Sequence, residues 1–228
     1  TLYLGDCLDV MLSIPDGSVD MILCDLPYGT TACKWDTVIP FEPLWAQYRR
    51  IAKRNAAIVL TASQPFTSAL VMSNPAEFKY GWVWEKSKAS NFLLARKQVL
   101  KAHEDVVVFI QGTPSYFPQM VEGKAFKGAG RSKKGANWEG VNHVPNDTKR
   151  ADNNGTRFPR SVQYFATAES EKIGALHPTQ KPVALMEYMI RTYTDEGETV
   201  MDNCMGSGTT GVACANTDRR FIGIEKEV

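Results

Sequence analysis

Continuous apolar runs recur along the chain and predict buried strands. We expect strands at 2–5, 19–24, 56–62, 80–86, 105–110, 199–203 and 220–225. Many of these runs do not alternate apolar with polar residues, which is typical of strands that are covered on both faces. The pattern therefore indicates a sheet that lies inside the domain.

Two segments between the strands show helical spacing. In 182–194 a proline stands in the first turn and the apolar residues recur at helical intervals. In 40–54 the apolar residues lie on one stripe. The end of 40–54, near the negative end of the helix dipole, carries Arg49, Arg50, Lys53 and Arg54. Strands that alternate with helices predict an α/β domain with a mostly parallel sheet.

One stretch, 123–160, departs from this pattern. It is rich in Gly, Asn and Lys, has few aliphatic residues and shows no period, so it cannot build a core of its own. It is also distinctly basic. We therefore expect 1–110 and 171–228 to form one domain, and 111–170 to be a basic, partly irregular insert.

Composition narrows the classes of protein. The chain has 228 residues, 43% hydrophobic content and a net charge of +1, so no global field indicates a polyanionic partner. The 5 cysteines are scattered without a CxxC pair, and the 3 histidines lack zinc-ligand spacing. We expect reduced thiols, no metal and a cytosol-like compartment. No apolar stretch approaches membrane-spanning length, and no signal peptide is visible.

The segment 200–227 carries the strongest local signal. A predicted strand ends at Asp202, three glycines precede and enter a helix that begins near Thr209, and a second strand ends at Glu225. Glycines let a ligand approach backbone N–H groups at a helix N-terminus, and an acid ending the next strand is placed to bind ribose hydroxyls. A Rossmann-type nucleotide site follows. NAD fits less well, and no phosphate-binding P-loop is present.

The strand at 19–24 leads directly into Asp25, with Pro27 and Tyr28 close behind. Ligands of open α/β sheets bind at the carboxyl ends of strands. The Asp25 carboxylate and the backbone carbonyls around Pro27 are hydrogen-bond acceptors, and Tyr28 supplies an aromatic ring. This combination suits a planar ligand that carries an exocyclic amine. An ordinary turn with a core tyrosine explains the same residues, and from these residues alone it is the better reading.

Three motifs in their order resemble one family over nearly the whole chain. They are "DLPY" at 25–28, "HPTQKPVALMEYMI" at 177–190 and "DNCMGSGTTGVA" at 202–213. The chain resembles the beta-type, S-adenosylmethionine-dependent DNA methyltransferases that methylate adenine N6 or cytosine N4. The resemblance implies a Rossmann-like fold with circularly permuted motifs. It also implies a catalytic half in 1–110, a target-recognition insert in 111–170 and a cofactor-binding half in 171–228.

The resemblance also implies roles for individual residues. Asp25, the Pro27 carbonyl and Tyr28 would hold a flipped-out base, with Tyr28 stacking on it. Asp6 would reach the cofactor's adenine amine, Glu225 its ribose and Lys181 its carboxylate. The full set implied for the cofactor is Asp6, Cys7, Asp25, His177, Thr179, Lys181, Asp202, Gly206, Gly208, Thr209, Thr210 and Glu225.

We expect the methylated atom to be N6 of adenine. Asp25 stands where cytosine N4 enzymes carry serine, and cytosine N4 is the alternative. Leu26 replaces the proline of the commoner motif and leaves the functional groups intact. A catalytically silent DNA-binding homologue, and an RNA or protein methyltransferase, are the rival hypotheses.

Double-stranded DNA is the partner that the resemblance implies, gripped through phosphates. Any one lysine taken alone is better explained as a solvated charge. The residues expected at the DNA are Lys34, Trp35, Lys86, Lys88, Arg96, Lys97, Arg131, Lys133, Lys134, Trp138 and Arg157. A homodimer is left open, and the expected location is the cytoplasm of a bacterial or phage-infected cell.

Overall fold

The computed structural model describes residues 1–31, 33, 36–128, 152–170 and 180–226. The chain divides into two compact units. The large unit comprises Thr1–Phe117 and Arg160–Val228, and the small unit comprises Pro118–Pro159.

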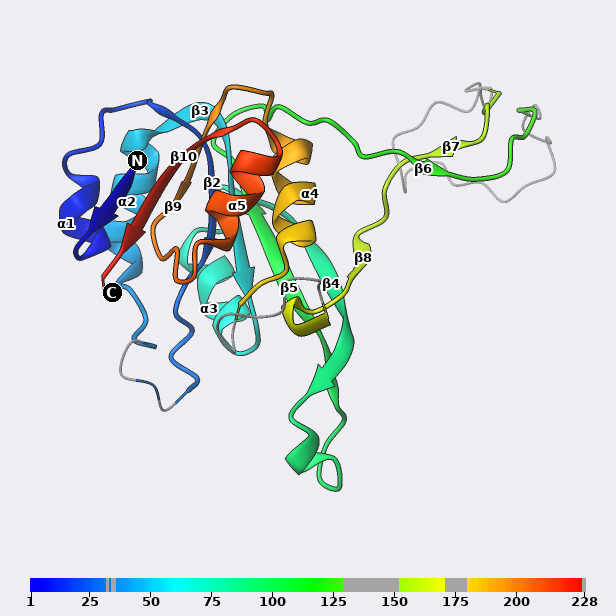
Figure 1. Cartoon of the computed structure of the whole chain (residues 1–228), viewed down its shortest axis with the longest axis horizontal. Coiled ribbons are helices and arrows are strands. Elements are labelled where there is room, and N and C mark those ends of the chain that lie inside the picture. Colours follow the sequence, from blue (N-terminus) through cyan, green and yellow to red (C-terminus); the bar gives the residue numbers. More distant parts are fainter. Residues whose placement is uncertain (32, 34–35, 129–151, 171–179, 227–228) are drawn as a thin grey trace. The chain divides into compact units, whose positions relative to one another are not determined.

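The large unit is built on an 8-stranded sheet with the order β1-β10-β9-β2-β3-β5-β4-β8 (Figure 1). β5 runs antiparallel to both of its neighbours, and every other neighbouring pair in the sheet is parallel. The strands are β1 (Leu2–Leu4), β2 (Val19–Asp25), β3 (Ala52–Ala62), β4 (Phe78–Ser90), β5 (Lys101–Phe109), β8 (Val162–Phe165), β9 (Thr199–Asp202) and β10 (Arg220–Glu225).

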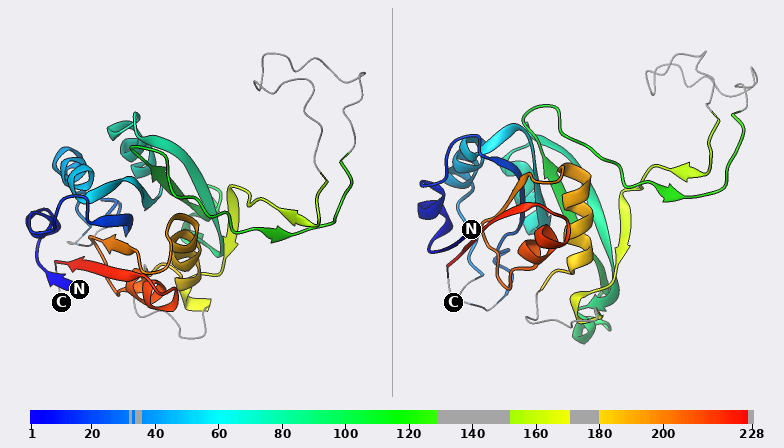
Figure 2. Two further views of the ribbon diagram at one scale, coloured as in Figure 1. Left: turned by 90° about the horizontal axis from the view of Figure 1, so that it is seen from above. Right: turned by 45° about the horizontal axis from the view of Figure 1, so that its top comes forward.

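Helices cover both faces of the sheet. They are α1 (Cys7–Met11), α2 (Phe41–Ile51), α3 (Phe66–Ser73), α4 (Val183–Tyr193) and α5 (Thr209–Asn216), with short 3-10 turns η1 (Phe92–Leu94) and η2 (Ala168–Ser170). The apolar residues of α1, α2 and α3 belong to one core cluster, and those of α4 and α5 belong to another. Figure 2 shows the two groups of helices on opposite sides of the sheet.

The continuous apolar runs follow from these two cores. On β2, Ile22 and Cys24 face the first cluster, whereas Met21 and Leu23 face the second. All four side chains are buried because alternate residues of a strand point to opposite faces. The expected Rossmann-like α/β fold with a mostly parallel sheet is confirmed.

The topology brings two distant motifs to one edge of the sheet. β2 lies between β3 and β9, although β9 follows it by more than 170 residues. β2 ends at Asp25, opposite Thr61 of β3, and β9 ends at Asp202. Since all three strands are parallel, their carboxyl ends meet at the same edge.

Several details differ from the sequence prediction, among them β8, which belongs to the main sheet although it lies within the predicted insert 111–170. The strand at 2–5 is not buried: Leu2 and Leu4 are each 66% exposed, because β1 is an edge strand paired only with β10. The helix predicted at 40–54 ends at Ile51. Lys53 and Arg54 belong to β3, and Lys53 forms an ion pair with Asp20 on β2 instead of facing a helix dipole.

The small unit contains a short two-stranded ribbon. β6 (Val121–Glu122) pairs antiparallel with β7 (Thr156–Arg157), and a bridge joins Phe126 to Asn153. Residues 129–151 between them lie outside the described residues. The assignment of 111–170 to target recognition stays a prediction.

Candidate active site

Asp25 is held at the end of β2 by two hydroxyl groups. The hydroxyl of Tyr28 donates a hydrogen bond of 2.7 Å to Asp25 Oδ1, and the hydroxyl of Thr61 donates to the same oxygen. Tyr28 and Thr61 also lie in hydrogen-bond contact, with 3.2 Å between their oxygens. The turn after the strand thus folds back on its own carboxylate and gives it a defined orientation.

The ring of Tyr28 is supported from below. It stacks on Phe66, at the start of α3, with 5.1 Å between ring centroids and 24° between planes. Burial is the main cause of a pKa of Tyr28 well above its usual value, and the charge of Asp25 adds to it. The phenol therefore keeps its proton and remains a donor to Asp25.

Leu26, the residue after Asp25, packs in the hydrophobic core. Its side chain is buried in the core cluster beneath α1, α2 and α3. This position points into the protein, and the effect of the departure from proline stays a prediction. The carbonyl of the next residue, Pro27, belongs to the same turn.

The loop after the turn is organised by Asp36. Its carboxylate accepts hydrogen bonds from the backbone N–H groups of Gly29, Thr30 and Thr31, at 2.7 to 2.9 Å. Burial alone would raise the pKa of Asp36, but these bonds and the Thr31 hydroxyl outweigh it and lower the pKa below its usual value. Asp36 is consequently ionised and ties down the backbone beside Tyr28.

Lys181 points at Asp25. Its Nζ lies 2.6 Å from Asp25 Oδ2 and 3.5 Å from Glu104 Oε2, and the residue is only 8% exposed. Burial alone would lower the pKa of Lys181, but the charges of these two carboxylates raise it above its usual value. Lys86 completes a row of alternating charges through an ion pair of 3.1 Å with Glu104.

The glycine loop begins with a buried acid. Asp202 accepts hydrogen bonds from the Thr210 hydroxyl at 2.6 Å and from the Cys204 N–H at 3.1 Å. Burial raises the pKa of Asp202 to about 6, although both hydrogen bonds act to lower it. Both carboxylate oxygens therefore bind the loop itself, which fixes the turn between β9 and α5.

Gly206 and Gly208 adopt left-handed backbone conformations, with φ of 50° and 80°. A Cβ at either position would meet no described atom within 4 Å, so open space lies beside both. Gly206 N–H donates to Glu225 Oε2 at 2.7 Å. The loop thus has an approachable backbone next to the acid that ends β10.

Asp6 lies on the same side. It caps α1 by accepting a hydrogen bond from the Leu8 N–H, and Lys226 Nζ is 3.3 Å from its other carboxylate oxygen. The Gly5 N–H donates to the Glu225 carbonyl at 2.8 Å, which links this loop to the end of β10. Cys7 begins α1 and is buried. Asp6 and Glu225 therefore lie in one region, and their implied roles stay predictions.

Eight expected site residues fall outside the described residues. They are Lys34, Trp35, Arg131, Lys133, Lys134, Trp138, His177 and Thr179. Their implied roles stay predictions.

The described residues expected at the DNA differ in exposure. Lys88 is exposed and pairs at 3.6 Å with the exposed Glu169, while Arg96 and Lys97 are exposed beyond η1. The side chain of Lys86 is 7% exposed and paired with Glu104, so its geometry favours an internal role over a phosphate contact.

Arg157 is engaged within the small unit. It donates to Asn153 Oδ1 and to the Lys124 carbonyl, and its guanidinium lies 5.0 Å from the ring centroid of Phe126. These contacts connect the two strands of the ribbon and the segments next to them.

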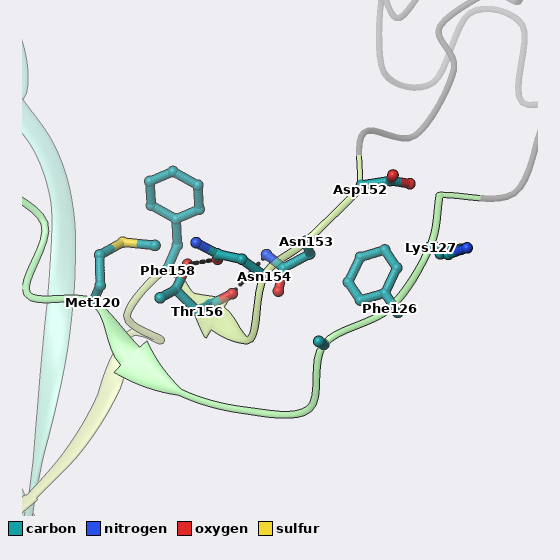
Figure 3. A pocket seen from close by; sticks show the side chains of 9 residues that line it. Met120, Phe126, Lys127, Asp152, Asn153, Asn154, Thr156 and Phe158 are labelled. Atoms are coloured by element: carbon teal, nitrogen blue, oxygen red, sulfur yellow. Dashed lines mark hydrogen bonds between the residues drawn. The ribbon is translucent and has the colours of Figure 1, made fainter.

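A pocket of about 720 Å³ lies in the same unit (Figure 3). Its lining combines exposed Phe158 with amide, carboxylate and ammonium groups. The lining residues are Met120, Ala125, Phe126, Lys127, Asp152, Asn153, Asn154, Thr156 and Phe158. The side-chain amide of Asn153 donates a hydrogen bond to the Thr156 carbonyl, and the Thr156 hydroxyl donates to Asn154 Oδ1.

Sequence reasoning missed Thr61, Phe66, Glu104 and Asp36. A weak signal existed for Thr61, because it is the polar residue near the end of an otherwise apolar strand. Phe66 and Glu104 gain their roles only from contacts across the fold, whereas Asp36 acts on the neighbouring backbone of Gly29, Thr30 and Thr31. Among the described residues, no group of three His, Cys, Asp or Glu side chains could hold a metal ion. No helix in the described ranges is long and apolar enough to cross a membrane.

A family model described as DNA methylase, N6_N4_Mtase, matches residues 19–228. The chain belongs to this DNA methylase family. The family predicted from the three motifs is thereby confirmed, and with it a DNA methyltransferase that uses S-adenosylmethionine. The chain is therefore an amino-methylating DNA methyltransferase, and the roles of its site residues stay predictions.

Relatives of this methylase span its full length. Type II methyltransferase M2.MboI of Moraxella bovis is 26% identical over 100% of this chain and 83% of the relative. DNA adenine methyltransferase YhdJ of Escherichia coli (strain K12) is 29% identical over 99% and 78%.

Solved methylases share the fold. The M1.HpyAVI-SAM complex has a TM-score of 0.65 and 23% identity, over 100% of this chain and 93% of that one. The PvuII DNA methyltransferase, described as cytosine-N4-specific, has a TM-score of 0.65 and 16% identity, over 100% and 82%.

Proposed function

We propose that this methylase transfers a methyl group to the exocyclic N6 of adenine in DNA. The observation that carries the proposal is the Asp25 carboxylate, oriented by Tyr28 and Thr61 at the sheet edge that also holds the glycine loop. The adenine activity named for the YhdJ relative supports the choice of base, as does aspartate at the first motif position. Cytosine N4 is the alternative.

The chemical task of the turn is to activate a weak nucleophile. The lone pair of an aryl amine is delocalised into its ring. In our proposal Asp25 and the Pro27 carbonyl accept hydrogen bonds from the two N–H bonds of the amine, which favours a tetrahedral nitrogen and frees its lone pair. The negative charge of Asp25 also stabilises the positive charge that develops on nitrogen.

Tyr28 has two tasks in this proposal. Its ring, backed by Phe66, offers a surface for stacking of the flipped base, and its hydroxyl keeps Asp25 oriented. The protein thus contributes position and electrostatics, and no covalent intermediate with a cysteine is needed.

The glycine loop between β9 and α5 and the two acids beside it fit S-adenosylmethionine. The open space beside Gly206 and Gly208 suits a nucleoside that approaches the backbone, and the acids Asp6 and Glu225 suit a ligand with hydroxyl and amine donors. We assign Glu225 to the ribose, Asp6 and the Cys7 backbone to the adenine, and the loop from Asp202 to Thr210 to the amino-acid part. When bound, the cofactor supplies an electrophilic sulfonium methyl group.

The direct test compares wild type with Asp25→Ala. Purified protein is incubated with labelled S-adenosylmethionine and unmethylated genomic DNA, and the digested nucleosides are separated by mass spectrometry. We expect N6-methyladenine from wild type and no transfer by Asp25→Ala, while both proteins still bind the cofactor. N4-methylcytosine would move the assignment to the alternative base. Absence of any transfer by wild type would favour the silent DNA-binding homologue.

Several finer expectations belong to the same proposal. Exposed Lys88, Arg96 and Lys97 are assigned to DNA phosphates, so affinity for duplex DNA should fall with rising salt and fall less steeply after their substitution. We also propose that transfer is metal-free and persists in excess EDTA. A homodimer, measurable by sedimentation, and a cytoplasmic location complete the proposal.

A further inference from the structure

Lys181 makes the same kind of contact that the target amine needs. Its ammonium donates a hydrogen bond of 2.6 Å to Asp25 Oδ2. In the proposed function this carboxylate accepts a hydrogen bond from the base amine. Because both donors are N–H groups aimed at one carboxylate, the ammonium competes with the substrate for Asp25.

Glu104 offers a second place for the ammonium. Its Oε2 atom is buried and accepts no hydrogen bond from any described group, and it lies 3.5 Å from Lys181 Nζ. Its other oxygen, Oε1, is held by Lys86 at 3.1 Å. A buried carboxylate oxygen without a donor is unusual in a folded protein, and Oε2 therefore has the capacity to accept the Lys181 ammonium.

The charges balance in either position. Asp25 and Glu104 supply two negative charges, and Lys181 and Lys86 supply two positive charges. A small movement of the Lys181 ammonium from one carboxylate to the other keeps this buried cation next to a carboxylate throughout, while Asp25 gains the amine on which positive charge develops. It therefore avoids the large cost of leaving a buried charge unpaired.

We propose that Lys181 is a positioning residue that moves between two carboxylates. In the structure its ammonium is hydrogen-bonded to Asp25 Oδ2. When the target amine enters, the ammonium moves to Glu104 Oε2, and Asp25 is then free to accept a hydrogen bond from the amine. Glu104 is the positioning residue that makes this exchange possible. The inference rests on the proposed function, and it differs from the sequence expectation that Lys181 binds the cofactor carboxylate.

The main test is Glu104→Gln, which keeps the shape of the side chain and removes its charge. We expect kcat on unmethylated genomic DNA to fall roughly 10- to 100-fold, because the ammonium then stays at Asp25 and the amine is misplaced. The Kd for S-adenosylmethionine and the KM for DNA should stay within about twofold. Glu104→Asp, which restores the charge, should recover part of kcat.

Glu85→Gln is the matched control, because Glu85 is an exposed acid on β4, the strand paired with that of Glu104. It should keep wild-type kcat. Thermal unfolding separates a folding defect from a catalytic one: if Glu104→Gln unfolds, the decision passes to Glu104→Asp, which should be folded and slower than wild type.

Lys181→Met distinguishes the two roles of the lysine. The inference expects a lower kcat with unchanged Kd for S-adenosylmethionine. A Kd raised tenfold or more with kcat preserved would show instead that Lys181 binds the cofactor. Wild-type kcat in Glu104→Gln would overturn the inference while leaving the proposed function intact, whereas an inactive wild type would defeat the proposed function itself.

Discussion

The hydroxyl of Tyr28 donates a hydrogen bond to Asp25 Oδ1 across 2.7 Å, within the turn that follows β2. Tyr28, which we propose stacks on the base, therefore also holds Asp25, which we propose accepts the amine, in a fixed orientation. Thr61, which donates to the same oxygen from β3, anchors these two residues to the sheet.

Tyr28→Phe isolates the hydroxyl from the ring. It keeps the stacking on Phe66 and removes one of the two hydroxyl donors to Asp25 Oδ1. We expect kcat to fall about tenfold, in line with the loss of a hydrogen bond to a charged group, while Tyr28→Ala should cost about 100-fold. Single-turnover methyl transfer measures both. Tyr164→Phe, at an exposed tyrosine on β8, should behave as wild type; equal rates for Tyr28→Phe and wild type would contradict the orienting role.

Gly208→Ala tests the glycine loop, and Gly17→Ala is its matched control. Both glycines are left-handed, with φ of 80° and 58°, and both have open space where a Cβ would be added. Each substitution should lower the free energy of unfolding by about 1 kcal/mol, because L residues resist this conformation.

The two glycine variants should differ in cofactor affinity. Isothermal titration should show Kd for S-adenosylmethionine raised only in Gly208→Ala, about tenfold, since the ligand approaches that backbone. Equal affinities in the two variants would place the cofactor elsewhere.

Asp36→Ala should loosen the loop beside the active site. It removes the acceptor of three backbone N–H groups, and we expect a loss of about 2 kcal/mol in the free energy of unfolding near neutral pH. The folded pKa of Asp36 is lowered, so its contribution is present above its unfolded value near 4 and disappears as pH falls through the folded value. Urea unfolding at several pH values should show the difference from wild type shrinking in acid. A difference that is constant with pH would contradict this account.

Asp202 should show the opposite sign. Its folded pKa is raised to about 6, so the folded state holds a proton that the unfolded state has released between pH ~4 and ~6. Stability from this group is therefore greatest in acid and falls as pH rises through that window, by on the order of 2–3 kcal/mol. Asp202→Asn, which cannot ionise, should lack this fall. Thermal unfolding of both proteins from pH 4 to 7 measures it, and parallel curves would exclude the effect.

Most strands and helices of the fold could be predicted from the sequence, because short local patterns restrict which structures a segment can form. Apolar runs such as 19–24 and 56–62 can be buried only between two layers, and the glycines between Asp202 and Thr209 permit one kind of strand-to-helix turn. The three motifs and their order also sufficed to identify the family. At the ends of elements this local reasoning failed: β1 is exposed, and the helix at 40–54 yields to β3 at Ala52.

The partners of the proposed catalytic residues were decided only by the tertiary structure. Sequence reasoning placed Asp25 in a turn but could not pair it with Thr61, because that pairing depends on the register of β2 against β3. Likewise Lys181 meets Asp25 and Glu104 only because β2, β5 and the segment before α4 converge on one edge. Hydrogen bonds and ion pairs act over a few ångströms, so residues far apart in the chain acquire a chemical relationship only when the sheet is assembled.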